Sequence, residues 1–165
     1  GLMPPLLSGW IALLLTLLLA GRFVYWKPRL AMQRLDIGIM YLGYLALVAQ
    51  LLIEFLRHIV HPEWAASVSI HVFTFGVMGL IIPGMLVRIS KGHTGRKVVF
   101  DALDKSALRI MMLGFVLRII APQLHPAGYT YWIYLAAACW FVCFALLAWR
   151  YIPFLAQPRV DGKEH

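Results

Sequence analysis

The sequence predicts an all-α fold, a polytopic transmembrane helix bundle with about five spanning helices. Hydrophobic residues make up 62% of the chain and charged residues 13%, whereas a soluble domain averages roughly 45–50% apolar and about 25% charged residues. The apolar residues form runs long enough to cross the roughly 30 Å hydrocarbon core of a bilayer as helices. No period-two alternation recurs, which disfavours a β-barrel. We therefore expect the lipid bilayer as a partner.

The expected spans are apolar runs bounded by polar, basic or proline residues. They cover about residues 2–20, 37–55, 64–89, 108–121 and 129–152. Asp101 and Asp104 precede the fourth span as candidate N-caps, and Pro153 is expected to stop the fifth. Neither a repeat nor a linker divides the chain. We expect a single membrane domain over residues 1–156 and a polar cytoplasmic tail over residues 157–165.

The distribution of basic residues predicts the orientation. Thirteen of the fifteen Lys and Arg residues fall after the first span, around the loop between the third and fourth spans, or near the C-terminus. The two remaining turns hold only Arg57 and Arg118. Because basic loops stay in the cytoplasm, we expect the N-terminus outside and the C-terminus inside. A net charge of +8 would suggest nucleic acid for a soluble protein, but basic residues between apolar runs fit topology signals, so no nucleic-acid partner is expected.

Ionisable residues gather near the expected outer side. Such residues are costly within or beside a span, so each needs a partner or a function. One interpretation is an interfacial network with snorkelling arginines; the other is a metal or haem site, because imidazole ligates metals and arginine pairs with haem propionates. His71 is then the first candidate ligand, with Glu54 or Arg118 supporting it as cofactor-binding residues. The cluster comprises Glu54, His58, His61, His71 and Arg118.

His93 requires a separate interpretation. It follows His71 by 22 residues, and a helix joining them would span roughly 33 Å. The two histidines should therefore not share one metal ion, and we treat His71 and His93 as candidate metal ligands at two distinct places. The surrounding basic, glycine-rich residues 91–97 fit either a plain cytoplasmic loop or an anion site.

Enzyme signatures are absent from the sequence. It has no G-x-S-x-G, H-E-x-x-H, P-loop or C-x-x-C-H motif. Catalytic residues are therefore unknown, and enzymatic activity is uncertain. Pro83 and Gly84 interrupt the third span in the manner of transporter helices, so a small-solute transporter remains an alternative function.

A resemblance to a known family rests on two stretches. The first is His71-Val-Phe-Thr-Phe-Gly76-Val-Met-Gly79, followed by Ile82-Pro-Gly84-Met85, Arg88 and Gly92-His93-Thr94-Gly95-Arg96. The second is Arg150-Tyr-Ile-Pro153 with Pro158-Arg159-Val-Asp161-Gly162. Together they resemble the signature and the C-terminal ending of the NnrS family.

The resemblance implies a bacterial inner-membrane protein of the nitric oxide response and of nitrosative-stress tolerance. It also implies haem and copper as cofactors, nitric oxide or iron–nitrosyl species as ligands, and about twelve spanning helices. We therefore expect this chain to be a C-terminal portion, with the missing N-terminal helices or another protomer as partners. His71 and His93 match motif positions as candidate ligands, and Arg88 and Arg96 match positions of unknown role. The alternative is a metal-free small-solute transporter or membrane assembly subunit.

Overall fold

The computed structural model describes residues 4–162, and these residues form helices without a β-strand. The predicted all-α fold class is confirmed. Five helical segments are long and apolar enough to cross a membrane, and they are Pro5–Tyr25, Leu35–Ile59, Ala65–His93, Ala102–Leu124 and Pro126–Leu155. The protein is therefore a multi-pass membrane protein. Residues 1–3 of the expected membrane domain and residues 163–165 of the expected tail lie outside the described residues.

The chain divides into two compact units, of which the first ends at Met78 and the second begins at Gly79. The first unit contains α1 (Pro5–Tyr25), α2 (Pro28–Ala31), α3 (Leu35–Ile59), α4 (Ala65–His71) and the π-helix η1 (Val72–Met78). The second contains α5 (Gly79–His93), α6 (Ala102–Ile119), α7 (Ala121–Leu124), the 3₁₀-helix η2 (Pro126–Gly128) and α8 (Tyr129–Leu155). The single membrane domain over residues 1–156 stays a prediction.

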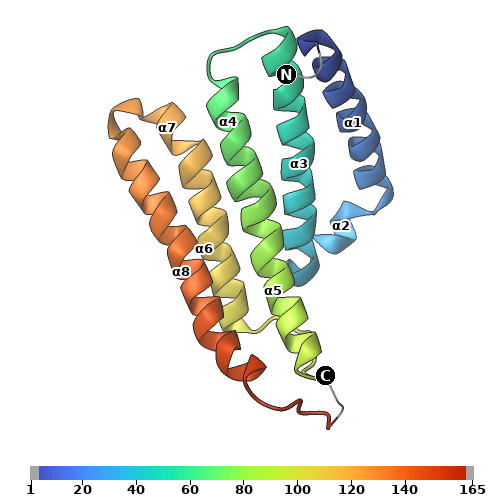
Figure 1. The fold of residues 1–165 in the computed structure, drawn as a ribbon, viewed down its shortest axis with the longest axis vertical. Coiled ribbons are helices and arrows are strands. Elements are labelled where there is room, and N and C mark those ends of the chain that lie inside the picture. Colours follow the sequence, from blue (N-terminus) through green and yellow to red (C-terminus); the bar gives the residue numbers. More distant parts are fainter. Residues whose placement is uncertain (1–3, 163–165) are drawn as a thin grey trace. The chain divides into compact units, whose positions relative to one another are not determined.

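In the first unit, α1 packs antiparallel to α3, with the short α2 between their ends (Figure 1). A Cβ atom on Gly9, near the start of α1, would lie 3.0 Å from Cδ1 of Ile59 at the end of α3. At the other end, the hydroxyl of Tyr44 donates a 3.0 Å hydrogen bond to the carbonyl oxygen of Leu19. Because Gly9 has no side chain, the two helices can approach closely at the end where Gly9 meets Ile59.

In the second unit, α6 and α8 pack side by side and α5 contacts both (Figure 1). Helix α6 begins at Ala102, earlier than the expected Leu108, because Asp101 caps it. The Asp101 carboxylate accepts from the backbone N–H groups of Leu103 and Asp104, and the Asp104 carboxylate accepts from the N–H of Asp101. This reciprocal capping box satisfies the free N–H groups of a polar first turn.

Pro153 does not stop α8, which continues to Leu155. The proline removes one backbone donor, but it lies in the last turn, where little helix remains to be disrupted. Many apolar side chains in both units face outward, including Leu17 at 61% and Phe141 at 72% exposed. Such surfaces are stable only against lipid or another apolar partner.

Candidate functional site

A polar network joins α3 to α4 in the first unit. Arg57 binds Oε2 of Glu54 through Nε at 2.8 Å and Nη2 at 2.7 Å. The Ser69 hydroxyl donates to Oε1 of the same carboxylate. The side-chain amide of Gln50 donates to the Ser69 oxygen at 3.4 Å. Both carboxylate oxygens of Glu54 are thus held by donors from two helices, as a charged group in a spanning segment requires.

The histidines near this network lie in different settings. Nε2 of His58 is 3.7 Å from Oε2 of Glu54, which confirms that these two side chains meet on one face of α3. His61 is exposed in the turn after α3, where it has a φ of 55°. Ser69 was not singled out from the sequence. The only signal for it was a small hydroxyl residue within an apolar span.

His71 is the last residue of α4 and is half-buried. The π-helix Val72–Met78 follows it directly, and π-turns inside α-helices are frequent at functional sites. Residues two apart on a helix point in roughly opposite directions, so His71 projects from a different face than Ser69. Arg57 and Ser69 bind the two carboxylate oxygens of Glu54. The expected role of Glu54 as a support for His71 stays a prediction.

Arg118 and His93 belong to the second unit. The guanidinium of Arg118, in the last turn of α6, lies 5.5 Å from the ring centre of Tyr129 and donates to its hydroxyl at 3.4 Å. His93 ends α5 and is exposed, and its backbone carbonyl accepts a 3.3 Å hydrogen bond from Arg159. The assignment of Arg118 to a cofactor and of His93 to a metal both stay predictions.

A second polar network joins α5, α6 and α8. Nζ of Lys91 lies 2.5 Å from Oδ2 of Asp104, whose side chain is fully buried. The hydroxyl of Tyr151 donates to the other oxygen of that carboxylate at 2.5 Å. Beside it, Arg150 donates to Oδ2 of Asp101 at 3.0 Å. Sequence reasoning missed this network apart from the candidate caps, because bonded partners are as far as 49 residues apart along the chain.

The carboxylate of Asp101, which caps α6, has a lowered pKa. Burial by itself would raise its pKa. The backbone hydrogen bond at Asp104 and the positive charges of Lys91 and Arg150 outweigh this effect and lower the pKa from its ordinary value of 3.8. Asp101 therefore remains charged, and keeps its ion pairs, in more acidic solution than a free aspartate.

The tail after α8 docks on the glycine-rich loop. The N–H of Val160 donates to the carbonyl of Thr94 at 3.2 Å. Gly95 has a φ of 72°, and a Cβ atom placed on it would lie 2.6 Å from Cγ of Asp161. Asp161 is in turn held by Arg159 at 2.7 Å. The two stretches that carry the family resemblance thus meet at this point, and Gly95 is the residue that allows the contact.

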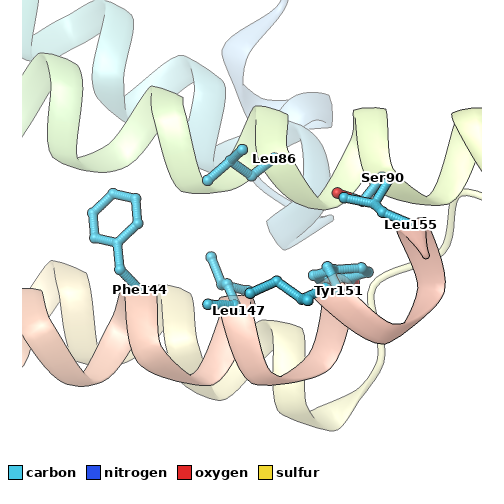
Figure 2. Close-up of a pocket in the computed structure, with 8 residues that line it drawn as sticks. Leu86, Ser90, Phe144, Leu147, Tyr151 and Leu155 are labelled. Atoms are coloured by element: carbon cyan, nitrogen blue, oxygen red, sulfur yellow. The ribbon is translucent and has the colours of Figure 1, made fainter.

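An apolar groove of about 280 Å³ opens between α5 and α8. Figure 2 shows Leu86 and Ser90 of α5 facing the α8 side chains across it. The α8 lining comprises Phe144, Leu147, Ala148, Tyr151, Ile152 and Leu155. It contains no histidine or cysteine, so the groove is suited to hydrocarbon rather than to a metal ion.

Comparison with protein families matches residues 1–159 to the family described as NnrS protein. The chain belongs to the NnrS family. No curated protein and no solved structure matches it. The resemblance first read from the segment between His71 and Arg96 and from the tail thus extends over nearly the whole chain, including the α3 network.

The family resemblance implies haem and copper, and the side chains of this NnrS chain fit haem better than copper. Haem requires only one or two axial ligands, and the half-buried imidazole of His71, with the small residues Gly76 and Gly79 following it, fits one such ligand. A protein metal centre generally needs three or more donors. Among residues 4–162, no group of three His, Cys, Asp or Glu side chains could hold a metal ion.

Proposed function

We propose that the protein is an inner-membrane, haem- and copper-binding member of the NnrS family that acts in nitric oxide response and nitrosative-stress tolerance. The orientation proposed with it has the N-terminus outside and the C-terminus in the cytoplasm. The observation that supports a haem most directly is the half-buried His71 at the junction of α4 and a π-helix. A histidine imidazole is a common ligand of haem iron.

In this proposal, each side chain has a defined task. His71 would hold the haem iron through an imidazole nitrogen, and Arg118, a residue of the second unit, would be the candidate cation for a propionate. Glu54, fixed by Arg57 and Ser69, holds negative charge at a set position beside α4. When bound, the haem iron would supply a site for nitric oxide or for an iron–nitrosyl species. His93 would be a metal ligand at a different place, and a copper ion there would need further donors besides this one imidazole.

An optical experiment tests the haem assignment. The full-length protein, purified from haem-replete cells, should show a Soret band that His71→Ala abolishes or shifts. His61→Asn is the matched control, because it also removes one imidazole and asparagine tolerates the positive φ at this exposed turn. An unchanged Soret band in His71→Ala would remove His71 from the proposal, and equal losses in both variants would indicate a general folding defect.

A metal-free small-solute transporter or assembly subunit is the second candidate. Its supporting observation is the interrupted third span, where the π-helix Val72–Met78 is followed by Pro83 inside α5. Interrupted helices leave backbone groups available for a solute at mid-membrane depth. Elemental analysis separates the two candidates, because this second one predicts neither iron nor copper in protein purified from metal-replete cells.

A further inference from the structure

Two arginines of the second unit share one aromatic ring. The guanidinium carbon of Arg96, in the loop after α5, lies 3.9 Å from the ring centre of Phe154. That of Arg150, on α8, lies 5.1 Å from the same centre. The two carbons can be no farther apart than the sum of these distances. Stacking on a ring orients each guanidinium, but two positive charges this close repel unless an anion lies between or beside them.

Each arginine also has a buried nitrogen without a hydrogen-bond acceptor. These atoms are Nη1 of Arg96 and Nε of Arg150. Burying a donor without an acceptor costs about 1–3 kcal/mol, and more for a charged group, so native proteins rarely keep such atoms without a ligand, ion or water. The two orphaned donors belong to the same cluster, so the described residues satisfy neither guanidinium group completely.

The nearby carboxylates in the described part of the chain have other partners. Asp101 binds Arg150 at 3.0 Å but also faces Lys91 at 3.5 Å. Asp104 binds Lys91, and Asp161 binds Arg159. No ion pair of Arg96 with a carboxylate occurs among residues 4–162. This end of the unit therefore keeps positive charge and free donor groups, of which Arg96 is the clearest case.

The position of the cluster suits a membrane-surface ligand. Arg150 and Phe154 line a hollow of about 230 Å³ together with Trp149 and Pro153. The Trp149 side chain is 72% exposed near the end of the α8 span, where tryptophan is typical of the membrane–water interface. Lys97 adds an exposed positive charge next to Arg96. Basic groups at this level attract anionic lipid headgroups, and guanidinium forks match phosphate oxygens.

We propose that Arg96 and Arg150, oriented by Phe154, bind a phosphate group, and that this phosphate belongs to an anionic phospholipid. The phosphate oxygens would accept from the more accessible guanidinium nitrogens of the two side chains and neutralise their paired charges. The apolar surroundings of Trp149 and Pro153 would contact the adjoining glycerol and acyl atoms. This site lies in the second unit, whereas His71 lies in the first, and it does not depend on the proposed haem.

Native mass spectrometry of the full-length protein in detergent tests the proposal. The probes are phosphatidylglycerol and phosphatidylcholine, and inorganic phosphate is tested in parallel by thermal unfolding. The wild type should bind a first phosphatidylglycerol more tightly than a first phosphatidylcholine. Arg96→Gln should weaken phosphatidylglycerol binding by about tenfold, because it removes charge-assisted hydrogen bonds to the phosphate and not only a nearby charge. Lys97→Gln, which removes a neighbouring exposed charge, should leave it nearly unchanged.

The other outcomes are equally definite. Equal weakening by Arg96→Gln and Lys97→Gln would overturn the proposal, because it would reveal attraction to net charge alone. Stabilisation by inorganic phosphate that depends on Arg96, without a preference for phosphatidylglycerol, would keep the phosphate site but overturn the lipid source. If Arg96→Gln is not monodisperse, Arg96→Lys makes the same test, since lysine keeps the charge but loses the planar fork. It should weaken binding, whereas Lys97→Arg should not.

Discussion

Nζ of Lys91 lies 2.5 Å from Oδ2 of Asp104, and this buried ion pair joins the end of α5 to the start of α6. The same ammonium group donates to the carbonyl of Val99 at 2.5 Å. Tyr151 of α8 completes the coordination of the carboxylate. The three long helices of the second unit are thus fastened at one end by charged hydrogen bonds, which are stronger than neutral ones.

We predict that Asp104→Asn strongly destabilises the protein. Removing one partner of a buried ion pair costs about 3–5 kcal/mol, and Lys91 would then face only the more distant carboxylate of Asp101, at 3.5 Å. The variant also keeps a side chain of similar shape, so the loss reports the charge. Thermal unfolding in detergent, followed by circular dichroism, measures it as a lower melting temperature.

Two further variants test whether the buried ion pair accounts for the loss of stability in Asp104→Asn. Asp104→Leu combined with Lys91→Met should recover much of the stability lost by Asp104→Asn, because an apolar pair leaves no buried charge. Tyr151→Phe removes one hydrogen bond to the carboxylate and should cost less, about 1.5–3 kcal/mol. Similar melting temperatures for Tyr151→Phe and Asp104→Asn would show that the ion pair is not the main fastening.

The lowered pKa of Asp101 predicts a pH dependence of stability. A carboxylate whose pKa is lower in the folded than in the unfolded state stabilises the fold above the unfolded value, near 3.8. That contribution disappears as the pH falls through the lower, folded pKa. Because Asp101 is 39% exposed, solvent screens the effect and keeps it small. Melting temperatures between pH 7 and pH 3 should fall less in Asp101→Asn than in the wild type.

Asparagine is the informative replacement at Asp101 because it also caps helices well. Asp101→Asn therefore removes the charge and keeps the cap, whereas Asp101→Ala removes both and should cost about 1 kcal/mol more at neutral pH. Identical acid profiles for the wild type and Asp101→Asn would show that this carboxylate does not contribute to the acid sensitivity.

The sequence was sufficient for the spans but not for the networks that connect them. Apolar runs predict five membrane helices because lipid imposes a length and a polarity on each one. The apolar run predicts a start at Leu108 rather than Ala102, because the polar residues Asp104 and Lys105 resemble a loop by local polarity alone. In the structure, Asp104 is buried because Lys91 and Tyr151, distant in the sequence, supply its partners.

The candidate site likewise contains one contact that the sequence predicts and one that it does not. Glu54 and His58 could be paired from the sequence because residues four apart share a helix face, and the structure confirms their contact. Ser69 could not be found this way, since it reaches Glu54 from another helix. Hydroxyl residues in apolar spans are common, and only the packing of α4 on α3 selects this one.

Gly95 should be far less tolerant of substitution than Gly162. Both have a positive φ, 72° and 70°, which disfavours any side chain. Only at Gly95 would a Cβ atom also meet Asp161, 2.6 Å from its Cγ. Gly162→Ala thus reports backbone strain alone, and Gly95→Ala reports strain plus displacement of the tail. Limited proteolysis should release the tail faster in Gly95→Ala, and equal cleavage rates would contradict the docking.

Gly9 offers a matched test of helix packing in the first unit. Gly9→Ala places a methyl group 3.0 Å from Cδ1 of Ile59 and 3.1 Å from Cβ of His58. Overpacking of this kind costs about 1–3 kcal/mol, and it displaces α1 from the helix that presents Glu54. Gly21→Ala, on the same helix, meets no atom within 4 Å and should stabilise the helix by up to about 1 kcal/mol. The two variants should therefore shift the melting temperature in opposite directions, and a shift of the same sign would show that α1 does not pack closely on α3 at Gly9.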